Sequence, residues 1–247
     1  MADGREWVAR FTADATRHAA LDGAADWGAP VGLDAGRRRA LGRSLARFQV
    51  GEDGDGAVLV AAAHRAGDPD VARAVELFVA QEQQHAALLS RLLVRLGADP
   101  VGWHWSDAAF VRLRRVLGLH TELAVLLVAE LVALEYYGAL AAGAPDPVVR
   151  AVAARVLADE QQHVVFHVER LRAGSTGLAR PVRAALRGAW WAVAAGATAV
   201  LVVDHGAALA GCGRARRVAA AAVLRRFAAA SGAALGTAPS ADPFWAA

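Results

Sequence analysis

The tetrapeptide Glu82-Gln83-Gln84-His85 occurs a second time as Glu160-Gln161-Gln162-His163, 78 positions further along the chain. Other residues recur at the same offset, namely Glu52 with Glu130, Asp68-Pro69 with Asp146-Pro147, Val71 with Val149 and Ala80 with Ala158. Internal repetition of this length indicates a repeated supersecondary unit. We therefore interpret residues 52–85 and 130–163 as two copies of one helix–turn–helix unit.

The spacing within each copy brings its acids and histidine together. A Glu and a His three residues apart lie on one face of a helix. The lone Glu of each copy stands 17 residues before the proline of the turn, and the Glu-x-x-His motif begins 13 residues after it. At about 1.5 Å of rise per residue, the two legs of each hairpin therefore bring these residues level. Two such hairpins packed face to face would gather four carboxylates and two imidazoles, those of Glu52, Glu82, His85, Glu130, Glu160 and His163.

This ligand set resembles that of the ferritin-like di-iron carboxylate superfamily, over residues from about 36 to 172. The resemblance implies an all-α protein built on a ferritin-like four-helix bundle. The 45-residue gap between His85 and Glu130 would hold the long crossover between the second and third helices. It also implies that the six residues bind two iron ions, or a manganese–iron pair.

Composition agrees with an all-α class. The 247 residues are rich in Ala, Leu and Val, and the basic residues are all Arg. The arginines form small clusters without a continuous basic stripe, so we expect no nucleic-acid partner. The single cysteine, Cys212, excludes an intrachain disulfide, and residues 1–6 lack the apolar run of a signal peptide. We expect a cytoplasmic protein.

Three regions are expected: an N-terminal extension over 1–34, the bundle over 35–172, and a C-terminal helical region over 173–247 packed on the bundle. Short helical runs in 1–34 would lie on the bundle as a lid or strap, with His18 as a surface or partly buried histidine and not a ligand. The first bundle helix would run without a break from about Asp34 to Arg65. Its glycines beside Glu52 (Gly51, Gly54 and Gly56) have two readings: close helix packing or a bulge, and room for substrate or O₂.

Further residues lie on or next to the ligand face. Tyr137 is seven residues from Glu130, and it is either a proton or electron relay or a core aromatic. His167 follows His163 by four, and an extra ligand, a base and a pocket-lining residue are all open roles for it. Asp159 resembles an outer carboxylate that holds a ligand histidine by its other nitrogen. The first copy has Gln81 at the corresponding position.

Residues 188–203 are uncharged and apolar, but 16 residues are short for a membrane span. We expect a fifth helix buried against the bundle or in a homodimer interface, with peripheral membrane contact as the alternative. Asp204-His205 follows it, with a capping or ion-paired role expected and a ligand role left open.

The resemblance implies an O₂-dependent di-iron oxidoreductase of the hydroxylase, desaturase or N-oxygenase type. The substrate would be an apolar small molecule or an acyl group, with an external electron donor. The alternative is a ferroxidase, an iron-handling protein or a metal-binding protein without turnover.

Overall fold

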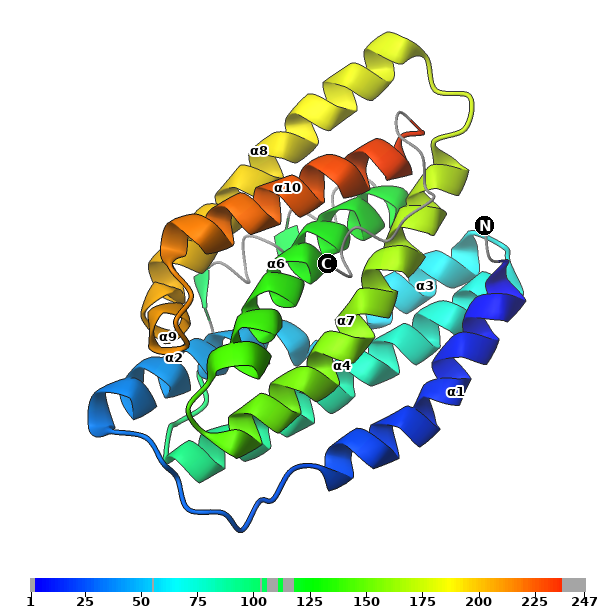
Figure 1. Ribbon diagram of the computed structural model, residues 1–247. Helices are drawn as coiled ribbons and strands as arrows, with labels where there is room; N and C mark the ends of the chain where they lie inside the picture. Colours follow the sequence, from blue (N-terminus) through cyan, green and yellow to red (C-terminus); the bar gives the residue numbers. More distant parts are fainter. Residues whose placement is uncertain (1–2, 55, 103, 106–110, 113–117, 237–247) are drawn as a thin grey trace.

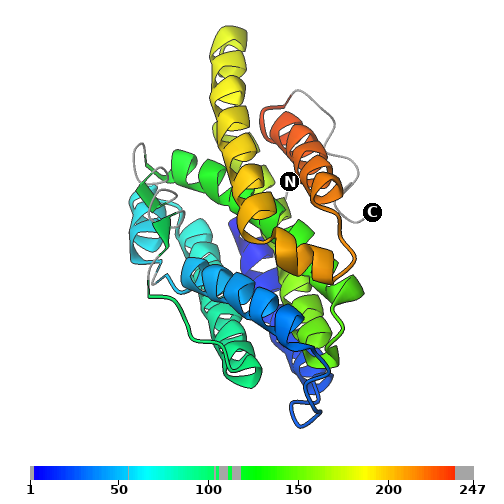
Figure 2. The same cartoon turned by 90° about the vertical axis from the view of Figure 1, so that its left-hand side faces the viewer.

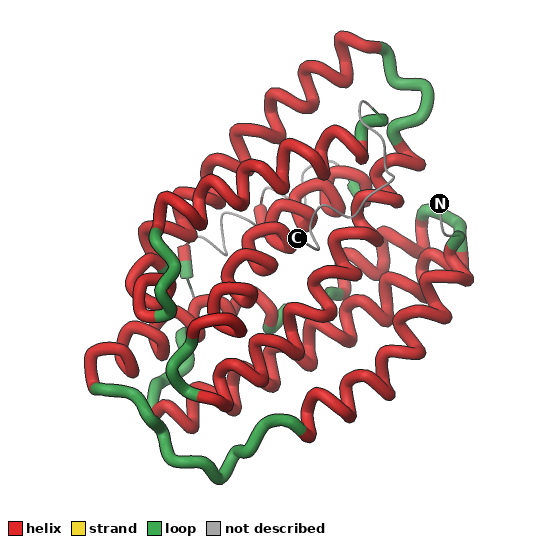
Figure 3. The backbone as a smooth tube through the Cα atoms, viewed as in Figure 1, coloured by secondary structure: helices red, strands yellow, loops and turns green. Residues whose placement is uncertain are grey.

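The computed structural model describes residues 3–54, 56–102, 104–105, 111–112 and 118–236. These residues form helices and loops and contain no strand, which confirms the all-α class (Figure 3). The labelled helices are α1 (Gly4–Gly23), α2 (Ala35–Glu52), α3 (Ala57–Arg65), α4 (Pro69–Leu96), α6 (Leu119–Gly143), α7 (Pro147–Gly174), α8 (Arg180–Asp204), α9 (Gly206–Gly211) and α10 (Arg216–Ala234). The predicted crossover corresponds to the connection between α4 and α6, and much of it lies outside the described residues.

The repeated Asp-Pro pair starts a long helix in both copies. One carboxylate oxygen of Asp68 accepts hydrogen bonds from the backbone N–H groups of Asp70 and Val71, and Asp146 caps α7 in the same way. The proline that follows each cap occupies the first turn, where its missing N–H costs nothing. Two local signals at the same offset therefore fix the start of α4 and of α7.

The residues of the two predicted hairpins lie in neighbouring helices, namely the α2–α3 segment, α4, α6 and α7 (Figure 1). The α2–α3 segment packs along α4, and α6 forms a hairpin with α7. α4 and α7 run antiparallel, because His85 pairs with Asp159 while Gln81 pairs with His163. The two Glu-x-x-His motifs therefore face each other across this contact.

The predicted continuous helix over 34–65 is wrong, because it is interrupted after Glu52. α3 begins only at Ala57, and Gly56 before it has φ +63°, which favours glycine. A Cβ atom at Gly56 would lie 2.4 Å from Val79 Cγ1 on α4. The backbone at Gly56 is therefore too close to α4 for a residue with a side chain to fit without movement of Val79. Each nearby glycine also weakens a helix by about 1 kcal/mol. The break leaves Glu52 at the end of α2.

The N-terminal segment forms one helix in place of the short runs predicted. Asp3 caps α1, and Trp7 and Phe11 are buried where α1 packs on α4 and α7. Both rings contact Phe166, and the indole N–H of Trp7 donates to Glu169 at 3.0 Å. α1 is thus anchored along its length to the two helices that carry the repeated motif.

The C-terminal region packs on α6 and α7 through α10, while α8 is largely exposed. α6 and α8 are both long and apolar enough to cross a membrane, but 72% of the apolar window of α6 is buried and only 22% of that of α8. The expectation of a buried fifth helix therefore fails for most of the surface of α8, which extends beyond the other helices (Figure 2). Small residues cover much of its outer side, and one stripe (Trp190, Ala194, Thr198 and Leu201) is buried.

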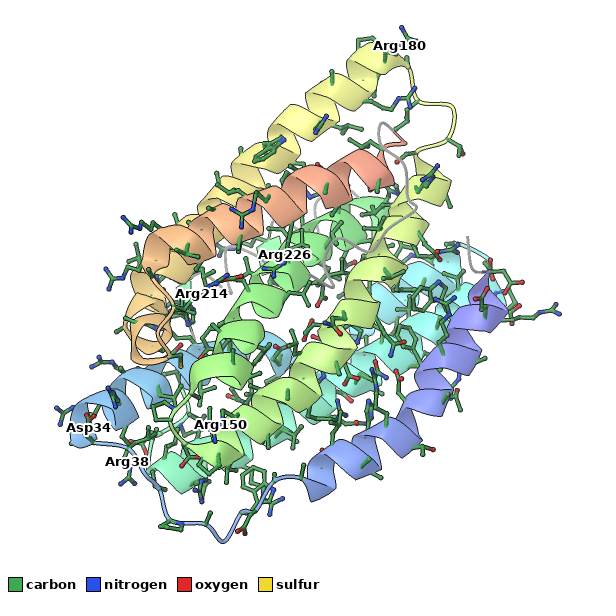
Figure 4. All side chains as sticks on the ribbon, viewed as in Figure 1. Asp34, Arg38, Arg150, Arg180, Arg214 and Arg226 are labelled. Atoms are coloured by element: carbon green, nitrogen blue, oxygen red, sulfur yellow. The ribbon has the colours of Figure 1, made fainter. Side chains whose placement is uncertain are left out.

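Ion pairs tie α10 and the turn before it to α6. Arg214 in this turn and Arg226 on α10 (Figure 4) each contact one carboxylate oxygen of the buried Glu135, at 2.5 and 2.6 Å. Glu135 therefore points away from the face of α6 that carries Glu130.

Candidate metal centre

The structure brings all six predicted ligand residues together in two overlapping groups. Glu82, Glu130, Glu160 and His163 form one, and Glu52, His85 and Glu160 form the other. Within each group the candidate ligand atoms lie within 4.8 Å of one another. Glu160 belongs to both, so the arrangement has the form of two adjacent cation sites that share a carboxylate.

The distances show how the shared carboxylate is placed. Glu160 Oε1 lies 3.3 Å from Nδ1 of His85, and Glu160 Oε2 lies 3.5 Å from Nδ1 of His163. Glu82 Oε1 faces both imidazoles, at 3.5 Å from His85 and 3.1 Å from His163. Glu130 Oε2 is 3.7 Å from His163. Both Nδ1 atoms therefore point toward the carboxylates.

The central atoms are buried without hydrogen bonds among the described residues. They are Glu82 Oε1, both carboxylate oxygens of Glu160, and Nδ1 of His85 and of His163. Buried polar atoms of this kind are costly unless something compensates them. Four carboxylates and two imidazoles supply the oxygen and nitrogen donors that Fe(II) and Mn(II) accept. The residues present thus fit a pair of divalent cations.

Burial and mutual charge divide the carboxylates into two pairs. Burial raises the pKa of Glu160 to about 8, helped by the negative charge of Glu130, and burial also raises the pKa of Glu52 well above its usual value. For Glu130, burial is outweighed by contacts with Glu160, His163 and His167, which lower its pKa to about 2. The same competition lowers the pKa of Glu82 through His163 and His85.

The pKa values of both central imidazoles are raised. Burial alone would lower the pKa of His85 and of His163, but the surrounding carboxylates outweigh it and raise both well above the ordinary histidine value. Without cations, protons on these groups balance the negative charge, as two metal ions would do in their place.

An outer partner holds each of these histidines by its other ring nitrogen. Asp159 on α7 accepts from Nε2 of His85 on α4, and Gln81 on α4 accepts from Nε2 of His163 on α7, both at 2.9 Å. Asp159 therefore occupies the expected position. The role of Gln81 was missed, although it lies at the repeat offset from Asp159. These bonds leave both Nδ1 atoms facing the carboxylates.

Tyr137 and His167 are fully buried next to the two groups. The hydroxyl of Tyr137 donates to Glu52 Oε1 at 3.0 Å, and Nε2 of His167 lies 3.4 Å from Glu130 Oε1. Neither residue is a member of the two groups. Tyr137 instead contacts Glu52, and His167 contacts Glu130.

Asp204 and His205 are not members of the groups either. The Oδ1 atom of Asp204 lies 3.6 Å from Nη1 of Arg47, which agrees with the expected ion-paired role. His205 is buried, and its Nδ1 lies 2.9 Å from Ser44 Oγ.

A cavity of about 490 Å³ borders the cluster. Its wall contains Glu52, Glu82 and Glu130, while His85, His163 and Glu160 are not part of it. The rest of the lining is mostly apolar and comes from α2, α3, α4, α6 and α8, with Gly51, Gly54 and Gly56 among the lining residues. Gly51 and Gly54 leave open space at the cavity wall, whereas Gly56 packs closely against Val79, so each of the two readings of the glycines describes part of this segment.

Fold and site together define an all-helical protein with a buried carboxylate–histidine centre beside an apolar cavity. No family model, curated protein or solved structure matches the chain.

Proposed function

We propose that this protein is an O₂-dependent di-iron oxidoreductase of the ferritin-like type that acts on an apolar small molecule or acyl group. The ligands would be Glu52, Glu82, His85, Glu130, Glu160 and His163, and a manganese–iron pair suits the same donors. The helical segments α2–α3, α4, α6 and α7 around the cluster support a ferritin-like four-helix bundle.

One observation carries this proposal: the cavity reaches the cluster on its carboxylate side. The imidazoles of His85 and His163 are held by Asp159 and Gln81 and are not part of the cavity wall, which Glu52, Glu82 and Glu130 supply. Small-molecule sites commonly have volumes of about 300–1,000 Å³ and apolar walls. A ligand in this cavity would therefore lie directly against Glu52, Glu82 and Glu130.

Two iron ions bound by these residues would supply O₂ activation and oxidation of the adjacent ligand. The chain itself would place the substrate and keep water away through the apolar lining, including Phe78 and Leu126. Tyr137 would hold Glu52 in place and keep a proton at its hydroxyl, because burial raises its pKa well above the usual tyrosine value. Hydroxylation consumes two electrons beyond those of the substrate, so the proposal includes an external electron donor.

The cavity favours this proposal over iron storage or ferroxidase activity, which has no need of a substrate-sized apolar space. Gly196 on α8 lines the cavity, and a Cβ atom added there meets no other atom within 4 Å. A phenylalanine at this position should fill part of the space without disturbing the helix. Gly188, on the same helix and equally open, lies outside the cavity lining and is the matched control.

The test measures O₂ uptake by the iron-loaded protein with a reductant and a set of apolar ligands. We expect a ligand that accelerates uptake in the wild type and in Gly188→Phe, with loss of this acceleration in Gly196→Phe at unchanged iron content. Rapid iron oxidation that is equal in all three proteins and independent of every ligand would favour ferroxidase activity.

A further inference from the structure

The N-terminal helix α1 reaches the outer partners of both central histidines. Asp14 and His18 lie one turn apart on α1, and both are buried. Asp14 Oδ2 accepts from Nε2 of Gln81 at 3.0 Å, and Nε2 of His18 lies 2.8 Å from Asp159 Oδ1. Gln81 and Asp159 are the two residues that hold His163 and His85. α1 therefore contacts both histidine supports from outside the repeat.

The contact with Asp14 determines which way the Gln81 amide faces. A carboxylate only accepts hydrogen bonds, so the NH₂ group of Gln81 must point toward Asp14. The amide oxygen of Gln81 then points toward His163 and accepts from its Nε2–H. With the amide reversed, two N–H donors would face each other and His163 would lose this bond. Asp14 thus acts on His163 through a single intermediate side chain.

The contact with His18 is one of several that hold Asp159. Arg17 and Arg155 also contact this carboxylate. Removal of His18 therefore leaves Asp159 partly supported, whereas Gln81 depends more strongly on Asp14.

Asp14, His18 and Asp159 are themselves close enough to suggest a third cation site. Two arginines already occupy this position: Arg17 contacts Asp14 and Asp159, and Arg155 contacts Asp159. A metal ion there would have to compete with two guanidinium groups. A supporting role fits these residues better than ligation.

We propose that α1 is a positioning element for the candidate metal centre, in which Asp14 orients His163 through Gln81 and His18 orients His85 through Asp159. The proposal rests on the proposed function in taking the two imidazoles as metal ligands. The aromatic contacts of α1 agree with it, since the ring of Phe11 lies 6.0 Å from that of His163, edge to face. Support of this kind typically changes metal affinity by about 10–100-fold.

The first measurement needs no metal. In the metal-free protein labelled with ¹⁵N-histidine, the buried Nε2–H groups of His85 and His163 should exchange slowly with water and give two protected imidazole resonances. Asp14→Ala should abolish protection at His163 and preserve it at His85, and His18→Ala should weaken protection at His85 only. Glu6→Ala, on the exposed side of α1, should change neither. Unchanged protection at His163 in Asp14→Ala would overturn the proposal.

A Co(II) titration of the same variants tests the consequence for metal binding. We expect Asp14→Ala to weaken one of the two Co(II) equivalents by roughly 10–100-fold. If the variants show the selective NMR effects but the wild type binds no Co(II), the metal function is wrong while the positioning of the imidazoles stands. Equal Co(II) affinity in the wild type and Asp14→Ala would contradict the effect on metal binding.

Two further variants test the link through Gln81, and the first of them keeps Asp14 in place in case Asp14→Ala folds poorly. Gln81→Met leaves α1 intact and should reproduce the loss at His163. Gln81→Glu combined with Asp14→Ala should restore protection at His163, because a carboxylate accepts from the imidazole whichever way it turns. Failure of this rescue in a folded protein would contradict the orienting role of Asp14.

Discussion

Asp159 on α7 holds His85 on α4 by a hydrogen bond of 2.9 Å to its Nε2 atom, and both side chains are fully buried. The same carboxylate neutralises the buried guanidinium of Arg155 one turn earlier on α7. One residue therefore supports both the candidate metal centre and the charge balance of the core.

Replacement of Asp159 by Ala should lower the free energy of unfolding by about 3–5 kcal/mol, because Arg155 and Arg17 would lose a buried counter-charge. The matched control is Asp22→Ala, since Asp22 lies 3.6 Å from the same Arg155 but is half-exposed. That change should cost no more than about 1 kcal/mol. Denaturant unfolding of both variants provides the comparison. Equal losses would show that the buried pairing has no special weight.

Gly56→Ala should destabilise the protein by about 2–4 kcal/mol, because the added Cβ meets both a positive φ and the side chain of Val79. Gly67 has φ +84° and open space around it, so Gly67→Ala measures the backbone strain alone. We expect a loss of about 1 kcal/mol there. Thermal unfolding of Gly56→Ala with Val79→Ala should show partial recovery. Equal losses of unfolding free energy in Gly56→Ala and Gly67→Ala would exclude the steric contribution of Val79.

Tyr137→Phe should keep the iron content and slow O₂ uptake, because Glu52 loses the hydroxyl that fixes its orientation. Tyr136 is its neighbour in sequence and equally buried, but its hydroxyl contacts Ser44. Tyr136→Phe should therefore leave O₂ uptake unchanged. A similar effect of both substitutions would point to core packing as the common cause and would leave Tyr137 as a core aromatic.

Protonation of the buried His205 should destabilise the protein in mild acid. Burial and the positive charges of Arg47 and His104 lower its pKa to about 3, whereas an unfolded histidine titrates near 6.5. Its stabilising contribution is thus complete above pH ~6.5 and is lost as the pH falls toward about 3. By pH 5 the loss should be about 2 kcal/mol. The free energy of unfolding of His205→Gln should decline less steeply than that of the wild type over this range.

The repeat made much of the site predictable. Matched spacing around Asp68-Pro69 and Asp146-Pro147 set the level of each Glu relative to its Glu-x-x-His, and the structure brings these residues together. Asp14 and His18 were not predicted as part of the site, because they have no counterpart at the repeat offset and α1 reaches the centre only through tertiary packing. The break at Gly56 depends on the approach to Val79, a contact that local glycine content does not specify. The exposure of α8 was missed because apolar composition alone does not show which side of a helix is covered.

Anaerobic loading of the metal-free protein with Fe(II), followed by a count of bound iron per chain, tests whether the six residues hold two metal ions. We expect about two irons in the wild type and in Glu76→Ala, a change at a surface residue of α4 that pairs with Arg73. Glu160→Ala should lose both irons, because Glu160 belongs to both groups, whereas Glu52→Ala should weaken only the iron beside His85. No stoichiometric iron in the wild type, or iron binding that is the same in all four proteins, would contradict the two-metal centre.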